Sequence, residues 1–287
     1  MRVILLLLFC ACLVVGCYAQ KDDDIKLGID PVEPFRIAGN LYYVGSNDLT
    51  SYLIVTPKGN ILIDSGMKEM VPQVMSNIEK LGFKPSDLKF ILNSHAHFDH
   101  AGGIAEVRRL TGAKFLASEL DAPLLMRGGK GDPNFGDKYS FESTKPDETF
   151  TNGKQVKLGG TTLTANITSG HTKGCTTWTT TVKDGGKDLN VIFVCSVSSP
   201  GYQLVDNKGY PDIEADYNRS FEWFKNAKVD IFLGSHAGFF DLEGKSKALK
   251  AGAKINPFVD PKGYREFIGE AEKAFRQKLS EQKGASK

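Results

Sequence analysis

Short, mostly apolar stretches separated by Gly, Asn and Asp turn residues run through the first half of the chain, and this pattern predicts short β-strands. Hydrophobic residues at helical spacing instead predict helices over residues 70–81 and near 103–110. Strands and helices therefore alternate, which indicates a mixed α/β structure. The strands expected in this half are residues 41–45, 51–56, 60–64, 88–92 and 114–117.

The second half of the chain shows the same kind of pattern. A Gly-Gly pair within residues 184–187 predicts a tight turn between two strands. Helices are expected over residues 213–226 and 263–279, and Asp260-Pro261 supplies a cap and a first-turn proline for the last one. The strands expected here are residues 155–158, 162–167, 176–182, 189–194 and 229–234.

No linker separates the two halves, so we expect a single domain over residues 20–287, with similar αβ halves that meet near residues 150–155. The domain would consist of two strand-rich layers covered by helices. Residues 127–153 are rich in Gly, Pro, Asp and Lys and show no periodicity. A loop this long is either a binding loop that shapes a pocket or a surface insertion.

Composition and charge narrow the class of protein. The chain has 287 residues, of which 41% are hydrophobic and 24% charged, so a folded globular domain is expected. Lys and Arg number 36 against 34 Asp and Glu, and this balance argues against a nucleic-acid-binding protein. The 5 cysteines are too few for a disulfide scaffold.

The N-terminal residues are typical of a secretory signal. Arg2 precedes an apolar run at residues 3–15, which is too short to span a bilayer as a helix, and small residues follow. We expect residues 1–19 to be a signal peptide, cleaved after Ala19, and the protein to be periplasmic or secreted. Lipidation at Cys17 is the alternative, because residues 14–17 resemble a bacterial lipobox.

All 5 histidines fall in segments that follow expected strands. His95 and His97 are separated by one residue, so in extended backbone both side chains project to the same side and can bind one metal ion. Asp99 and His100 come next, in a turn before a helix, where they can face a second ion. Two further histidines, His171 and His236, follow later strands. This concentration of metal-binding residue types predicts a metal centre.

The chemistry of these ligands favours two zinc ions in a catalytic site. Neutral imidazoles and a carboxylate suit zinc. Structural zinc sites are mostly rich in cysteine and closed, whereas six nitrogen and oxygen ligands shared by two ions leave positions open for water and substrate. A zinc-bound water has a pKa near 7, so hydroxide would be available to attack a carbonyl. No Gly-x-Ser-x-Gly motif offers a serine nucleophile instead.

The His-x-His-x-Asp-His motif at residues 95–100, Gly170-His171-Thr172 and the late His236 resemble the metal motifs of the metallo-β-lactamase superfamily. The resemblance extends over residues 30–280. It implies a four-layer αββα sandwich with metals at the edge between two similar halves. The superfamily includes thioesterases, lactonases, sulfatases and nucleases, so the fold alone does not identify the substrate.

His100 and Ser196 together make the chain most similar to the third subclass of class B β-lactamases. The resemblance implies that Asp99 orients a zinc-bound hydroxide, that Ser196 holds water near the second zinc, and that Ser198 contacts the carboxylate of a β-lactam. The activity implied is hydrolysis of the β-lactam amide bond, which gives antibiotic resistance. The metal ligands implied are His95, His97 and His171 for one zinc ion and Asp99, His100 and His236 for the other.

Two questions concern the two cysteines of the mature chain. If the strand that ends near residue 194 were shifted by one residue, the Cys195 thiolate would face the metals in place of Ser196. We favour Ser196 at this position because His100 already completes the second ligand set. We also predict a disulfide between Cys175 and Cys195, because a turn centred on Gly185 places them opposite each other in a hairpin. Two free thiols are the alternative.

Two other functions are compatible with the sequence. A lactonase or thioesterase-type zinc hydrolase could share the fold, but the Asp that usually bridges the metals in those enzymes is missing at Ser196. A non-catalytic zinc-binding surface protein is also conceivable, although all six metal-binding residues are present. The expected partner is a small-molecule β-lactam, with no nucleic acid and no transmembrane helix, and the protein is expected to be a monomer.

Overall fold

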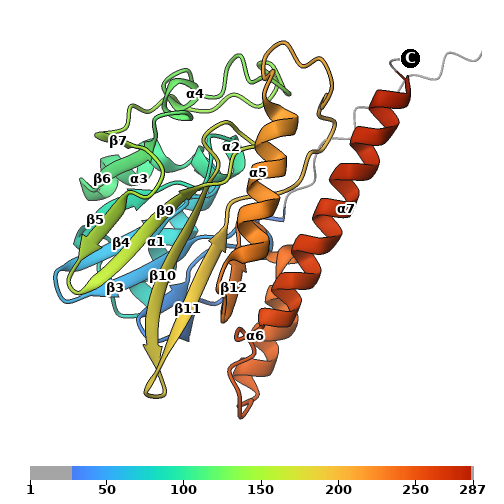
Figure 1. Ribbon diagram of the computed structural model, residues 1–287. Coiled ribbons are helices and arrows are strands. Elements are labelled where there is room, and N and C mark those ends of the chain that lie inside the picture. Colours follow the sequence, from blue (N-terminus) through green and yellow to red (C-terminus); the bar gives the residue numbers. More distant parts are fainter. Residues whose placement is uncertain (1–27, 286–287) are drawn as a thin grey trace, which may run out of the picture.

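A computed structural model describes residues 28–285 and shows two β-sheets with helices on their outer sides (Figure 1). The predicted signal peptide, including Cys17 and Ala19, lies outside the described residues. Within residues 28–285, no helix is both long and apolar enough to cross a membrane.

The first sheet has seven strands, in the same order in space as along the chain. The strands β1 to β4 pair antiparallel, whereas β4 to β7 pair parallel. Its strands are β1 (Phe35–Ala38), β2 (Leu41–Tyr43), β3 (Tyr52–Thr56), β4 (Gly59–Ile63), β5 (Leu88–Leu92), β6 (Lys114–Ser118) and β7 (Glu148–Phe150).

The second sheet has five strands in the order β12-β11-β10-β9-β8. All neighbours pair antiparallel except β11 and β12, which are parallel and are joined by a helical crossover, as parallel strands require. The strands are β8 (Gln155–Leu158), β9 (Thr161–Ile167), β10 (Thr176–Asp184), β11 (Lys187–Val194) and β12 (Ile231–Gly234).

The helices lie on the outer faces of the two sheets, so the fold is the predicted four-layer αββα sandwich (Figure 1). α1 and α3 pack on the first sheet, and α5 and α7 pack on the second. The helices are α1 (Val71–Lys80), α2 (Phe98–Ala101), α3 (Ile104–Thr111), α4 (Ala122–Met126), α5 (Ile213–Asn226), α6 (Leu242–Lys250) and α7 (Pro261–Ala285).

Alternation along the strands explains the layers. In β3, Leu53 belongs to the core beneath α1 and α3, whereas the next residue, Ile54, belongs to the core between the sheets. The two sheets contact each other through aromatic rings, for example Tyr52 and Phe193, whose centroids are 5.0 Å apart. The indole nitrogen of Trp178 in the second sheet also donates to the carbonyl oxygen of Asn93, directly after β5 (3.1 Å).

The β10–β11 hairpin confirms the predicted turn but shifts its register. Gly185 and Gly186 both adopt positive φ, +56° and +80°, and form a two-residue turn. Trp178 therefore pairs with Phe193, one residue away from the register expected for a turn centred on Gly185. The predicted disulfide between Cys175 and Cys195 is nevertheless present, with a Cα–Cα distance of 5.9 Å. Both cysteines lie just outside the paired segments, so the register does not constrain them.

Several predicted elements need correction. Asp99 and His100 lie within the single-turn helix α2 rather than in a turn before a helix, and the loop predicted at residues 127–153 contains β7. The final helix is longer than expected, because it starts at Pro261 and continues to Ala285. The sequence patterns did not reveal β1, α2, α4, β7 or α6.

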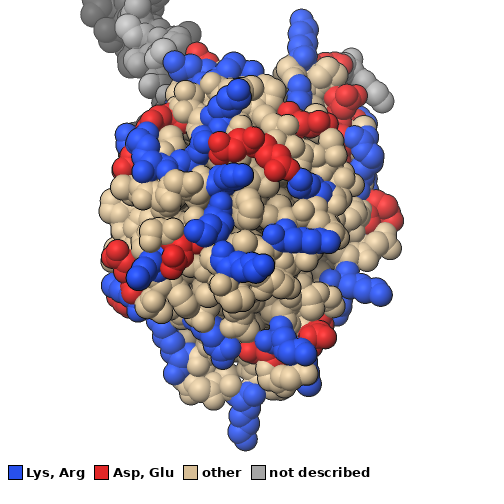
Figure 2. Space-filling view, turned by 90° about the vertical axis from the view of Figure 1, so that its left-hand side faces the viewer, with Lys and Arg blue, Asp and Glu red and all other residues tan. Residues whose placement is uncertain are grey.

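Basic and acidic side chains lie interspersed on the face of the molecule shown in Figure 2. Ion pairs of the described residues include Arg108 with Asp147 and Arg109 with Glu142.

Candidate metal centre

The segment that follows β5 carries four of the six predicted ligands, two in a loop and two in α2. Asp64, directly after β4, binds the first residues of this segment. The Asp64 carboxylate accepts hydrogen bonds from Asn93 Nδ2 (2.9 Å) and from the backbone nitrogen of Ser94 (2.7 Å). His97 has extended backbone (φ −101°, ψ 154°) directly before α2. The chain thus changes from extended to helical within the motif, which lets consecutive ligands face different positions.

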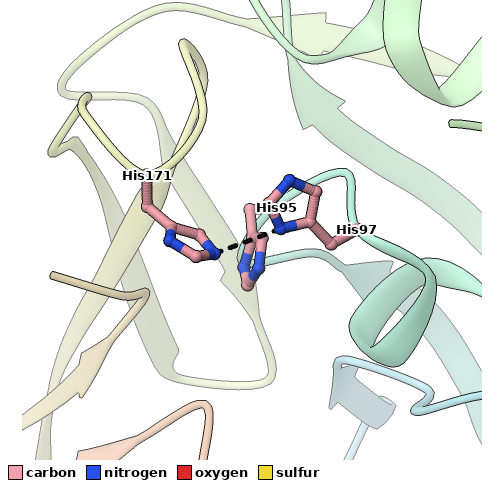
Figure 3. Close-up of side chains that lie close together, drawn as sticks. All are labelled: His95, His97 and His171. Atoms are coloured by element: carbon pink, nitrogen blue, oxygen red, sulfur yellow. Dashed lines mark hydrogen bonds between the residues drawn. The ribbon is translucent and has the colours of Figure 1, made fainter. Parts of the chain in front are cut away.

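The first three predicted ligands, His95, His97 and His171, lie together as the sequence predicted (Figure 3). One metal-binding atom from each lies within 4.8 Å of those of the other two, and His97 Nδ1 is 3.1 Å from His171 Nε2. His95 Nε2 is buried and has no hydrogen-bond partner. A buried, unpartnered nitrogen is costly in a folded protein, so this cluster fits a metal ion as the missing partner.

The electrostatics of this cluster keep the imidazoles of His95 and His171 neutral. Burial, together with the charges of neighbouring histidines, lowers the pKa of His95 well below its usual value. Burial and the adjacent His97 likewise lower the pKa of His171 to about 3. Neutral imidazole is the form that binds a metal ion, because the lone pair of the ring nitrogen is then free.

The other three predicted ligands also converge, around one oxygen and two nitrogens. Asp99 Oδ2 lies 3.2 Å from His100 Nε2 and 3.5 Å from His236 Nε2, and the two nitrogens are 3.3 Å apart. Zinc bonds of 2.0–2.1 Å in tetrahedral geometry place neighbouring ligand atoms about 3.3 Å from each other. The three atoms therefore match one face of a zinc tetrahedron.

Asp99 is ionised within this set. Burial alone would raise its pKa, but the adjacent His100 and His236 outweigh burial and hold the pKa of Asp99 below its usual value. An ionised carboxylate is the form required of a metal ligand.

Each histidine that offers one nitrogen to these clusters has its second nitrogen close to another group. Such contacts fix the orientation of a metal ligand and strengthen it as a base. Four of these contacts are hydrogen bonds: His95 Nδ1 with Ser94 Oγ (3.0 Å), His97 Nε2 with Asp132 Oδ2 (3.3 Å), His171 Nδ1 with the Ser198 carbonyl (2.8 Å) and His236 Nδ1 with Asp48 Oδ1 (3.3 Å). His100 Nδ1 is buried without a hydrogen-bond partner and lies 3.6 Å from Asp64 Oδ2.

Two of these supporting carboxylates, Asp48 and Asp132, were missed in the sequence. Burial raises the pKa of each, but the facing histidine more than compensates, so that both values are lowered. Asp48 lies in the turn between β2 and β3, and Asp132 lies within the aperiodic loop after α4. Neither position has a motif or a periodicity that could have identified it.

The two serines predicted to contact substrate lie directly after β11. Ser196 Oγ and Ser198 Oγ are 3.1 Å apart, and Ser198 is exposed. The sulfur of Cys195 lies 3.6 Å from His95 Nδ1 but is bonded to the sulfur of Cys175, so it is not free to bind a metal ion. The disulfide leaves no thiolate at this position, which removes the alternative register in which Cys195 binds a metal.

Comparisons with known proteins agree with this arrangement. Residues 48–236 match the family model of the metallo-beta-lactamase superfamily. The structure is similar to that of the FEZ-1 metallo-beta-lactamase from Legionella gormanii, with a TM-score of 0.87 and 47% sequence identity, over 88% of this chain and 98% of that one. It is also similar to BJP-1, a subclass B3 metallo-beta-lactamase of Bradyrhizobium japonicum, with a TM-score of 0.85 and 39% identity, over 91% of this chain and 99% of that one.

A more local similarity links the chain to an N-acyl homoserine lactonase of Bacillus cereus, which is 35% identical over 75 residues, or 18% of this chain and 30% of the lactonase. The family match covers well over half of the chain, and the two solved structures extend the similarity over nearly all of the described fold. The chain therefore belongs to the metallo-beta-lactamase superfamily.

Proposed function

We propose that this protein is a dizinc β-lactamase that hydrolyses the amide bond of β-lactam antibiotics and thereby gives resistance to them. The observation that carries the proposal is the pair of triads. One consists of imidazole nitrogens of His95, His97 and His171, and the other of Asp99, His100 and His236 atoms spaced 3.2–3.5 Å apart. The similarity to FEZ-1 and BJP-1 over nearly the whole chain supports β-lactams as the substrate class.

Each triad would hold one zinc ion. His95, His97 and His171 would hold the first, and Asp99, His100 and His236 the second. Zinc at these positions would polarise the substrate carbonyl and lower the pKa of a bound water to about 7. Three protein ligands per ion leave a position open for water or substrate, which a catalytic zinc site requires.

The side chains around the metals would orient the reactants. The Asp99 carboxylate has two oxygens, so one can contact the zinc while the other accepts a hydrogen bond from the attacking water or hydroxide and orients it. Ser196 would hold a water molecule near the second zinc. The exposed Ser198 hydroxyl would donate a hydrogen bond to the carboxylate that β-lactams carry next to the reacting ring.

A lactonase is the second candidate, and the similarity to the Bacillus cereus enzyme favours it. That similarity covers only 18% of this chain. The residue at the end of β11 also argues against it, because Ser196 stands where the lactonase-type enzymes usually have a metal-bridging Asp.

Turnover of nitrocefin, a chromogenic β-lactam, tests the proposal. We expect zinc-loaded protein to hydrolyse nitrocefin, a chelator to abolish the activity, and added zinc to restore it. An N-acyl homoserine lactone, assayed in parallel, distinguishes the two candidates. Hydrolysis of the lactone without hydrolysis of nitrocefin would establish the lactonase instead, and hydrolysis of neither would contradict both.

We further propose that the protein is exported and acts as a monomer in the periplasm or outside the cell. Support comes from the basic start and the apolar run of residues 3–15. Mass spectrometry of the protein isolated from the periplasm or the medium tests the site of processing. A chain that begins at Gln20 indicates cleavage after Ala19, whereas a lipid-modified chain that begins at Cys17 indicates a membrane anchor.

A further inference from the structure

Asp121 precedes helix α4 at the position where an Asp usually caps the helix, yet its side chain makes no capping hydrogen bond. The carboxylate is buried and instead accepts three hydrogen bonds from other parts of the chain. The donors are the backbone nitrogen of Ala96 (3.0 Å), Thr172 Oγ1 (2.8 Å) and the backbone nitrogen of Gly174 (2.7 Å).

These donors belong to the two loops that carry the first histidine triad. Ala96 lies between His95 and His97, and Thr172 follows His171. One carboxylate thus joins the loop after β5 in the first sheet to the loop between β9 and β10 in the second. This is the gap across which His97 Nδ1 and His171 Nε2 approach to 3.1 Å.

Gly174 shows how closely the second loop approaches Asp121. A Cβ atom at Gly174 would lie 2.6 Å from the backbone nitrogen of Asp121 and would also collide with Ser118 Oγ. Real Cβ atoms do not tolerate such contacts, so only glycine allows this approach. The absence of a side chain at Gly174 therefore lets its backbone nitrogen reach the Asp121 carboxylate.

We infer that Asp121 is a positioning residue for the first metal-binding triad, a role that rests on the proposed zinc function. It contacts none of the three histidines. Instead it sets the distance between the loops from which they project. The two oxygens of Asp121 bind different loops: Oδ1 accepts a hydrogen bond from Gly174, and Oδ2 accepts hydrogen bonds from Ala96 and Thr172. An Asn side chain cannot do this, because its NH₂ group would face an N–H donor at one end.

Zinc affinity of the Asp121→Asn variant, measured by competition with a chromophoric chelator, tests the inference. The His97→Ala variant identifies which binding step of the wild-type protein belongs to the first triad. We expect Asp121→Asn to weaken that step by about tenfold, at the lower end of the effect of groups that support metal ligands. The other step should change little. The isosteric variant Thr172→Val, which removes one of the three hydrogen bonds, should give a smaller loss at the same step.

Asp147→Asn is the matched control. Asp147 also accepts a hydrogen bond from a backbone nitrogen, that of Phe115 (2.8 Å), and pairs with Arg108, but it contacts neither loop of the first triad. This variant should leave both zinc-binding steps unchanged.

Unchanged zinc affinity in folded Asp121→Asn would overturn the inference, and so would an equal loss at both steps, which would indicate general loosening of the fold. If Asp121→Asn does not fold, the zinc affinities of Thr172→Val at the two binding steps test the inference by the same criteria. Wild-type protein that binds no zinc would overturn the proposed function and this inference with it, whereas normal zinc binding by the variants would overturn the role of Asp121 alone.

Discussion

Asp99 differs from the other members of the two triads because it is a carboxylate among imidazoles. Four of the five histidines, all except His100, have the second nitrogen hydrogen-bonded to a protein group, such as Asp48 for His236 or Asp132 for His97. Those rings are thereby fixed in orientation. Asp99 has one oxygen close to His100 and His236, and its second oxygen can act on the substrate side.

We expect Asp99→Ala to lower kcat about 100-fold or more, the cost of misplacing a reacting group. KM should change much less, because an interaction made in the transition state does not strengthen substrate binding. Steady-state kinetics with nitrocefin, together with zinc analysis of the same preparation, measures both effects. Asp188→Ala, which removes an exposed carboxylate in β11, is the control. If Asp99→Ala keeps its zinc and a kcat within a few-fold of the wild type, the role assigned to Asp99 is wrong.

Ser198 is expected to act on binding rather than on the chemical step. Its hydroxyl would bond to a substrate carboxylate that does not react, so the interaction is the same in the ground state and the transition state. Removing a hydrogen bond to a charged group should raise KM about tenfold in Ser198→Ala, with a smaller change in kcat. Ser199→Ala is a matched control at the next position. An unchanged KM for several β-lactams would exclude Ser198 from the substrate site.

The elements that carry a clear hydrophobic period were predictable, and the others were not. α1 buries Val71, Val74 and Ile78 on one face, and its predicted range differs from the structure by about one residue at each end. α6 instead buries Leu242, Lys245 and Ser246, a set with no hydrophobic stripe. Its position depends on contacts from distant segments, such as Lys245 with Asp260 at 2.7 Å. Contacts of that kind leave no local pattern in the sequence.

In the candidate site, too, some residues could be predicted from the sequence and others could not. The six predicted ligands, which the structure brings together, could be named because five are histidines, a rare residue type in this chain, and the sixth, Asp99, lies within the motif of residues 95–100. Asp121 and Asp132 could not, because Asp is common in turns and loops for local reasons. What distinguishes these two residues is the distant group that each contacts, and this becomes visible once the chain is folded.

The start of α7 gives a prediction about stability and pH. Asp260 Oδ1 accepts from the backbone nitrogen of Gly263 (2.8 Å), as a capping residue does, and Lys245 pairs with its other oxygen. Burial raises the pKa of Asp260, but Lys245 and the backbone donor lower it below its usual value. A carboxylate with a lowered pKa stabilises the fold above its unfolded pKa, near 3.9, and loses that contribution as the pH falls through the folded value.

Asp260→Ala should therefore lower the free energy of unfolding by about 1 kcal/mol at pH 7, the usual effect of removing a helix cap. The difference from the wild type should shrink below about pH 4, where the wild-type carboxylate becomes protonated as well. Urea unfolding of both proteins at pH 7 and at pH 3 measures it. A difference that stays the same at both pH values would show that the charge of Asp260 does not contribute.

At the scale of the whole molecule, each triad draws on both sheets. His95, His97, Asp99 and His100 follow β5 of the first sheet, whereas His171 follows β9 and His236 follows β12 of the second. In each triad, ligands from the first sheet meet one histidine from the second. An ion bound at either triad would therefore connect the two sheets at the edge where their loops meet.

Zinc should consequently stabilise the whole fold rather than one loop. A ligand that binds only the folded protein adds about 2.7 kcal/mol per site at 100 times its dissociation constant. Urea unfolding of metal-free protein at increasing zinc concentrations should show a free energy of unfolding that keeps rising with the logarithm of free zinc. A separate equilibrium-dialysis titration of the folded protein should saturate at two zinc ions per chain. His171→Ala and His236→Ala should each lose one equivalent and keep the other, because they belong to different triads. Saturation of the wild type at one equivalent, or loss of both equivalents in either variant, would contradict two independent triads.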